Sequence, residues 1–223
     1  MITKTRKSIW QLLSLTGLIG VLFYTAHVLI GGFLWQGYSH LSQTISELTA
    51  NGAPDAGFLS ILTTIYGILM IIFSVSLYFI FRALEVKNVA RIGAILLIVM
   101  EVTSLGGYSF FPLDEAGSTM NFQNIMHIVV TAVVVLTTLS CFYFTGIGLL
   151  KTPGFSKIGR FVLIMAVIIT VAGFATPMTM ASGLPFSGLV ERLNIFSIQT
   201  CLSVLSIYFF LRQKPVVVET IKD

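Results

Sequence analysis

Residues 57–81 read GFLSILTTIYGILMIIFSVSLYFIF, a run of 25 residues without one charged side chain. A helix needs about 20 apolar residues to cross the hydrocarbon core of a bilayer, so this run is long enough to span a membrane. A spanning segment must also satisfy its backbone hydrogen bonds internally, which an α-helix does. The run therefore predicts a transmembrane helix.

Five further runs of the chain have the same apolar character. The six predicted spans are 9–33, 57–81, 91–111, 123–150, 159–180 and 189–211. They are continuous runs, whereas an outer-membrane barrel is built from short segments of alternating polarity. The sequence therefore predicts an all-α integral membrane bundle of six transmembrane helices, which forms a single domain over residues 1–223.

The composition of the whole chain agrees with this class. Of its 223 residues, 56% are hydrophobic and 10% are charged, and the mean hydropathy is +0.94. A soluble domain is about one-quarter charged, so this chain cannot cover a surface that faces water. The composition predicts membrane lipid as the partner. It excludes nucleic acid as the reason for the net charge of +4, and it excludes a secreted disulfide scaffold.

The basic residues predict how the chain is oriented. Twelve of the thirteen lie in the terminal segments, or in the links between spans two and three and between spans four and five. All of these segments fall on one side of a six-span protein, and Arg192 is the exception. Loops rich in Lys and Arg stay in the cytoplasm. We therefore expect a multi-pass protein of the cell membrane with both termini in the cytoplasm.

The first outer loop, residues 35–54, reads WQGYSHLSQTISELTANGAP. Within it, residues 39–48 can form about two to three helical turns, because Leu41, Ile45 and Leu48 then share one face. We expect a short amphipathic helix here. It lies either in the membrane interface, with the leucine face among lipid headgroups, or over the bundle, with the polar face turned inward.

Three segments of the chain carry a resemblance to a known family. They are YSHLSQTISELTANGAPDAG at 38–57, FPLD at 111–114 and GLVERL at 188–193. The chain resembles the bacterial and archaeal six-span family catalogued as domain of unknown function 998. That resemblance implies a six-helix integral membrane protein and brings no reaction, substrate or cofactor. The positions that match recurrent polar residues of the family are Ser42, Ser46, Glu47, Asp114, His127, Glu191 and Arg192.

In the predicted topology these polar residues all reach the outer face, from four different segments of the chain. Titratable groups crowded beside apolar walls repel one another or lose solvation unless they compensate each other or bind something. We therefore expect an outward-facing polar cavity that binds a small polar ligand, a lipid headgroup or a divalent metal ion. The candidate metal ligands are Glu47, Asp114, His127 and Glu191.

Two titratable residues lie within the predicted spans, Glu101 and His27. Glu101 is near the middle of the third span, where a charge costs a few kcal/mol. It is either a neutral acid bonded to a neighbouring polar group, or a functional proton or ion site. His27 lies in the outer half of the first span.

No reaction motif in the sequence is specific, so three classes of function remain. Ligand binding at the outer face ranks first. A hydrolase acting at the outer leaflet through a metal-bound water or an acid–base group ranks second, although the chain has neither an HExxH nor a GxSxG motif. A proton-coupled transporter, which would need Glu101 to communicate with both faces, ranks third. A bis-histidine haem site is disfavoured because His27 and His127 lie at different depths.

Overall fold

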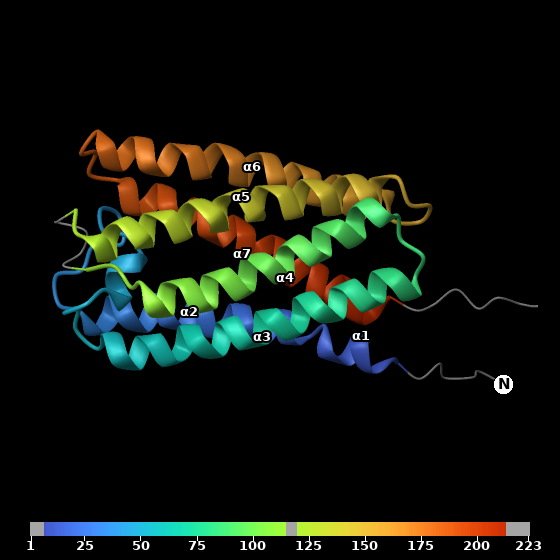
Figure 1. The fold of residues 1–223 in the computed structure, drawn as a ribbon, viewed down its shortest axis with the longest axis horizontal. Coiled ribbons are helices and arrows are strands. Elements are labelled where there is room, and N and C mark those ends of the chain that lie inside the picture. Colours follow the sequence, from blue (N-terminus) through green and yellow to red (C-terminus); the bar gives the residue numbers. More distant parts are fainter. Residues whose placement is uncertain (1–6, 115–119, 213–223) are drawn as a thin grey trace, which may run out of the picture.

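The computed structural model describes residues 7–114 and 120–212, which form long helices lying side by side (Figure 1). The elements are α1 (Ile9–Leu13), α2 (Thr16–Leu34), η1 (Ser46–Thr49), α3 (Ala56–Ala83), α4 (Asn88–Phe110), α5 (Phe122–Leu150), α6 (Ser156–Ala181) and α7 (Ser187–Leu211). Six segments are long and apolar enough to cross a membrane, with α1 and α2 together forming the first. The prediction of a six-span all-α bundle is confirmed.

The predicted span boundaries differ most at the starts of α4 and α6. These helices begin at Asn88 and Ser156, ahead of the apolar runs that start near 91 and 159. Hydropathy finds only the apolar part of a helix, whereas backbone hydrogen bonding extends the helix into the polar link. The six spans are therefore slightly longer than their apolar runs.

The first span is interrupted between α1 and α2. Ser14 ends α1, and its carbonyl oxygen accepts a hydrogen bond of 2.7 Å from the hydroxyl of Ser206 on α7. The same hydroxyl accepts a bond of 3.0 Å from the amide of Leu18. A break inside a membrane is tolerated where neighbouring groups satisfy the freed backbone, and Ser206 does this here.

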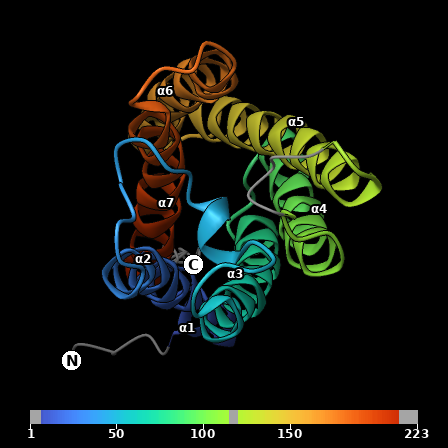
Figure 2. The same cartoon turned by 90° about the vertical axis from the view of Figure 1, so that its left-hand side faces the viewer.

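Viewed along the helices, α2 to α7 form a ring in chain order, which closes where α7 meets α2 (Figure 2). The short helix η1 lies inside the ring at one end, which we call the η1 end. Helix α1 begins, and α7 finishes, at the opposite end, which we call the terminal end (Figure 1). Because the number of spans is even, Ser8 before α1 and Arg212 after α7 lie at this same end.

The close-packed core occupies the terminal half of the ring. Its fully buried side chains include Phe73 and Phe81 of α3, Phe142 of α5 and Phe209 of α7. Helices approach closely here, since a Cβ added to Gly148 would lie 2.2 Å from the backbone nitrogen of Ala90. Small residues at such crossings bring membrane helices into direct contact. This half of the ring is filled.

In the half of the ring nearer η1, buried side chains such as Leu48 and Leu59 lie among half-buried ones. Along α4, the six residues from Thr103 to Tyr108 are all half-buried, whereas Met100 and Glu101 just before them are buried. On α7, Glu191 and Ile195 are half-buried, whereas Leu202, nearer the terminal end, is fully buried. The two halves of the bundle therefore differ, and the polar residues of interest lie in the half nearer η1.

Candidate ligand-binding site

The loop that follows α2 passes along α7 before η1 enters the ring (Figure 2). Arg192 of α7 fastens it, because Nη1 donates to the carbonyl oxygen of Gln43 at 2.7 Å and Nη2 donates to the hydroxyl of Tyr38 at 2.6 Å. That hydroxyl in turn donates to the carbonyl oxygen of Thr44 at 2.6 Å. Arg192 is only 8% exposed. We call these four residues the latch.

Two further residues at the start of α7 bind the same loop. One carboxylate oxygen of Glu191 accepts a hydrogen bond of 2.6 Å from the amide of Ile45. The hydroxyl of Ser187 donates to the carbonyl oxygen of Ser42 at 3.0 Å. The first turn of a helix has amide groups without helical partners. The loop supplies a partner for one of them, since the carbonyl oxygen of Leu41 accepts from the amide of Leu189 at 2.9 Å. The start of α7 and the loop therefore form one hydrogen-bonded unit.

Burial shifts the titration of two loop side chains. It raises the pKa of Tyr38 to about 12, although the positive charge of Arg192 acts in the opposite direction. Burial, with a smaller contribution from Arg192, lowers the pKa of His40. Both side chains are therefore neutral near pH 7, and Tyr38 keeps the proton that it donates to Thr44.

The predicted amphipathic helix over 39–48 is not confirmed. Only the short 3-10 helix η1 forms, and Leu41 is 58% exposed while Leu48 is fully buried. Side chains replace the helical bonds, because Gln43 accepts from the amide of Ser39 and Glu47 accepts from the amide of Thr44. The hydroxyl of Ser39 likewise accepts from the amide of Ser42 at 3.3 Å, an alternative to helical bonding that serine offers the backbone. The loop is therefore a series of turns that ends in η1.

Glu47 and Ser46 have structural contacts within this loop. The carboxylate of Glu47 accepts from the amide and the hydroxyl of Thr44, at 2.8 and 2.9 Å, and from the side-chain amide of Gln43 at 3.1 Å. The hydroxyl of Ser46 lies 3.1 Å from that of Thr44. These contacts fix the shape of the loop just before η1.

Asp114 belongs to a second cluster, at the junction of α4 and α5. Its carboxylate accepts from the side-chain amides of Asn51 at 3.1 Å and Asn121 at 2.6 Å. Its amide donates to the side chain of Asn124 at 2.8 Å, and the amide of Asn51 donates to the carbonyl oxygen of Leu113 at 2.8 Å. Asp114 thus ties the far end of the η1 loop to the α4–α5 junction.

His127 lies one layer deeper and bonds to backbone. Its Nδ1 is 2.9 Å from the carbonyl oxygen of Phe111, so this nitrogen carries the proton. Its ring is 5.1 Å from the ring of Tyr108. The polar residues selected from the sequence therefore fall into two clusters, one around Arg192 and one around Asp114. Among the described residues, no three His, Cys, Asp or Glu side chains are placed to hold a metal ion.

Three tyrosines from different helices lie in the η1 half of the ring. The ring of Tyr24 on α2 is 4.9 Å from that of Tyr66 on α3. Tyr24 is also close enough to Tyr108 on α4 and to Glu191 on α7 for electrostatic interaction. Helices α2 and α4 are not neighbours in the ring (Figure 2), so Tyr24 and Tyr108 approach the interior from different sides. The Tyr108 hydroxyl donates to that of Thr131 on α5 at 3.2 Å. The three tyrosines and Glu191 are all half-buried.

Below the tyrosines lie buried polar groups with incomplete hydrogen bonding. The side-chain amide of Gln199 donates to the Tyr66 hydroxyl at 2.9 Å, which leaves its own carbonyl oxygen, Oε1, without a partner. Glu101 is 1% exposed, interacts electrostatically with Tyr66, and has an unpartnered Oε1. On the other side of Tyr24, one turn nearer the η1 end, buried His27 has no partner for either ring nitrogen. The sequence left two alternatives for Glu101, a neutral acid bonded to a neighbouring polar group or a functional proton or ion site. For the first alternative, Oε1 of Glu101 lacks the expected hydrogen-bond partner.

We call this group the inner polar set. Its members line the interior of the ring from the η1 end to the top of the core, and they are Tyr24, Tyr66, Glu101, Tyr108, Glu191 and Gln199. Of these, the sequence indicated Glu101 and Glu191 as site candidates. It did not indicate the tyrosines or Gln199, and the one signal for them is a hydroxyl or amide in the middle of an apolar run.

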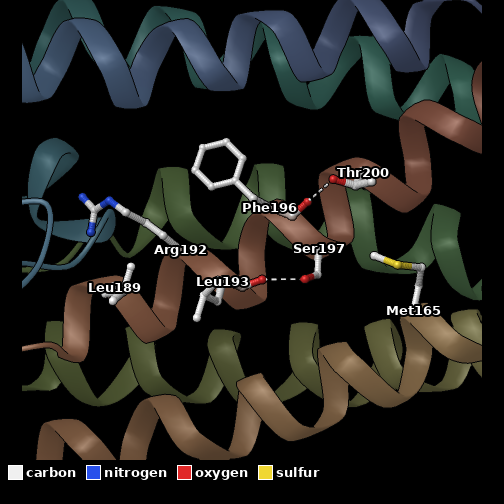
Figure 3. A pocket seen from close by; sticks show the side chains of 7 residues that line it. All are labelled: Met165, Leu189, Arg192, Leu193, Phe196, Ser197 and Thr200. Carbon is white, nitrogen blue, oxygen red and sulfur yellow. Dashed lines mark hydrogen bonds between the residues drawn. The ribbon is translucent and has the colours of Figure 1, made fainter.

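A separate open groove of about 270 Å³ follows α7 on another face (Figure 3). Its lining is mostly apolar, from Met165, Leu189, Arg192, Leu193, Phe196, Ser197 and Thr200. The hydroxyls of Ser197 and Thr200 bond to carbonyl oxygens of their own helix. Figure 3 shows the guanidinium of Arg192 extending away from the other lining side chains. The groove therefore suits an acyl chain better than a polar ligand.

Comparison with known proteins gives one match. The model of a family described as "Protein of unknown function (DUF998)" matches residues 18–208. No curated protein and no solved structure matches the chain. The matched range contains the whole latch and the whole inner polar set.

Proposed function

Because the chain belongs to the DUF998 family, whose description assigns no activity, we propose its function from the structure: it binds a small ligand inside the η1 half of the bundle. The observation that carries this proposal is the contrast between the two halves of the ring. The terminal half is filled by a close-packed apolar core, whereas tyrosine and glutamate side chains in the η1 half remain half-buried.

Polar groups at membrane depth are costly and occur mainly where they face a wet cavity or a ligand. Side chains that approach the interior of a ring from different sides, and still keep accessible surface, leave room between them for water or a ligand. Tyr24 and Tyr108 meet both conditions. The loop latched to Arg192 covers this space, with η1 as its roof. In the predicted orientation the site opens toward the outside of the cell.

The packed terminal half favours binding over transport, because a carried substrate would have to pass through fully buried side chains such as Phe81, Leu205 and Phe209. The hydrolase alternative would use His127 as its base. That imidazole bonds to the Phe111 carbonyl oxygen instead of orienting toward a serine or a carboxylate. The packed core and the His127 bond therefore both favour a binding protein.

Cysteine accessibility tests for the proposed space. Ile195 lies one turn from Glu191 on the same face of α7, and both are half-buried. In a background with Cys141→Ala and Cys201→Ala, we expect Ile195→Cys to react with a small charged methanethiosulfonate, because the reagent reaches it through water. Two controls should stay unreactive: Leu202→Cys in the core, and Leu193→Cys, which is 57% exposed but faces hydrocarbon. A rate at Ile195→Cys as slow as at Leu202→Cys would overturn the proposal.

A further inference from the structure

We infer that the ligand of this site is an organic cation, such as a protonated alkylamine; the inference rests on the proposed function and specifies its ligand. Three features of the inner polar set lead to this chemistry: the sign of its charged groups, the aromatic rings around the space, and the type of hydrogen-bonding atom that is left without a partner.

The first feature is charge. The titratable acids of the inner polar set are Glu101 and Glu191, which approach it from two different helices. The nearest cation, Arg192, is hydrogen-bonded to the loop, and its charge opposes that of Glu191 at Tyr24, so the two acids still outnumber the one arginine. An anionic ligand would meet carboxyl groups at low dielectric, where repulsion is strong. A cation is attracted by the same groups.

The second feature is the set of rings. Tyr24 and Tyr66 come from neighbouring helices and have rings 4.9 Å apart, and Tyr108 of α4 lies within electrostatic range of Tyr24. The face of an aromatic ring carries partial negative charge and attracts a cation within about 6 Å of its centre. Several rings around one point form an aromatic cage, a recognised way to bind organic ammonium groups. Tyr24 and Tyr66 supply two adjacent rings for such a cage.

The third feature is hydrogen bonding. Two buried oxygens of this set lack partners, Oε1 of Glu101 and Oε1 of Gln199. The amide nitrogen of Gln199 is bonded to the Tyr66 hydroxyl, and the other end of the same amide has no partner. A buried acceptor without a donor costs about 1–3 kcal/mol. An alkylammonium group brings three N–H donors and one positive charge, which satisfies the oxygens and compensates the carboxylate together.

A divalent metal ion would fit these residues less well. Hard cations take six or more oxygen ligands at short and regular distances. The described residues contain no group of three acids, histidines or cysteines placed for that purpose. The adjacent rings of Tyr24 and Tyr66 also favour an organic cation, because a small divalent ion holds its water molecules and so does not contact ring faces directly.

The probe is butylammonium, compared with 1-butanol as a neutral molecule of similar length and butyrate as an anion. Purified full-length protein in detergent is titrated with each, and the midpoint of thermal unfolding is measured. We expect only butylammonium to raise the midpoint. A shift of equal size with 1-butanol or butyrate would overturn the inference, and so would a shift with MgCl₂ or CaCl₂ that depends on Glu101.

Glu101→Gln keeps the shape of the side chain and removes its charge, so we expect at least about tenfold weaker binding, a loss of about 1.4 kcal/mol. Glu85→Gln is the matched control, because Glu85 is exposed at the terminal end, and it should bind as the wild type does. Equal affinity in both variants would overturn the inference.

Tyrosine variants keep the test decisive if Glu101→Gln does not fold. Tyr24→Phe retains the ring and should bind within about threefold of the wild type, whereas Tyr24→Leu should lose about tenfold, as expected for one cation–π contact. Equal binding by the two variants would contradict the cage.

If Ile195→Cys reacts but butylammonium does not bind, the cation inference fails and the proposed function stands. If Ile195→Cys is unreactive, the proposed function itself fails.

Discussion

Nη2 of Arg192 donates a hydrogen bond of 2.6 Å to the hydroxyl of Tyr38, joining the start of α7 to the loop that follows α2. The same hydroxyl makes a second hydrogen bond, of 2.6 Å, which it donates to the carbonyl oxygen of Thr44. One phenol therefore connects a buried guanidinium to the backbone just before η1. The position of η1 over the inner polar set depends on this connection.

Removing the hydroxyl of Tyr38 should loosen the loop. Tyr38→Phe leaves a donor of Arg192 and the carbonyl oxygen of Thr44 without partners, so we expect a loss of about 1–3 kcal/mol in the free energy of unfolding. Chemical denaturation in detergent measures it. Tyr78→Phe, which removes a hydroxyl on α3 outside the latch, is the control and should change stability less. Equal losses in the two variants would contradict the latch.

The same tyrosine predicts a dependence on alkaline pH. Its pKa is raised to about 12 by burial, whereas a tyrosine in an unfolded chain titrates near 10. The stability that Tyr38 contributes is therefore fully present below about pH 10 and is lost as the pH rises through about 12. We expect the difference in stability between wild type and Tyr38→Phe to be smaller at pH 11 than at pH 8. A difference that stays constant would contradict this titration.

A glycine in the first turn of α7 allows the loop to approach. A Cβ on Gly188 would lie 2.2 Å from the carbonyl oxygen of Gln43, a backbone atom of the latch. Gly188→Ala should destabilise the protein by about 1–3 kcal/mol, as overpacking does, and should increase proteolysis within residues 36–45. Gly57→Ala is a close control, because Gly57 is likewise the second residue of its helix and its added Cβ would meet nothing within 4 Å. Equal effects would rule out the steric cause.

The spans could be predicted because length and hydropathy are local properties of the chain. The break between α1 and α2 could not, since it depends on Ser206, which lies nearly two hundred positions away. The prediction of a helix over residues 39–48 is not confirmed, for a related reason. The spacing of Leu41, Ile45 and Leu48 favours a helix, but side-chain bonds within the loop and bonds to α7 satisfy its backbone instead.

The site was predictable in part. Topology brings the first loop to the same end as Glu191 and Arg192, and in the structure these two residues bond to Ile45 and Gln43 of that loop. Topology places residues at one end of a bundle but does not give the rotation of each helix. Asp114 therefore joins a separate cluster, and the pairing of Tyr24 with Tyr66 across two helices has no signature in the sequence.

Orientation in the membrane follows from the basic residues and can be tested on whole cells. In the cysteine-free background, an impermeant thiol reagent should label Ser182→Cys, an exposed site at the η1 end. Asn88→Cys, exposed at the terminal end, should label only after permeabilisation, because basic segments stay in the cytoplasm. The reverse pattern would turn the site toward the cytoplasm and leave the fold unchanged.

If the latched loop is the cover of the binding space, loosening it should admit reagents faster. Arg192→Ala removes the bonds to Gln43 and Tyr38, so we expect the methanethiosulfonate to modify Ile195→Cys about tenfold faster, as for the loss of about 1.4 kcal/mol from the closed state. Arg192→Lys keeps the charge but not the planar fork that reaches two acceptors, and should give an intermediate rate.

Arg160→Ala removes an exposed arginine at the terminal end and is the matched control, which should leave the rate unchanged. An increase confined to the Arg192 variants would mean that access to the inner polar set is limited by the loop, so that a ligand enters from the η1 end. An unchanged rate in Arg192→Ala would mean that reagents reach Ile195 by another route, and η1 would then be a fixed roof that ligands do not pass.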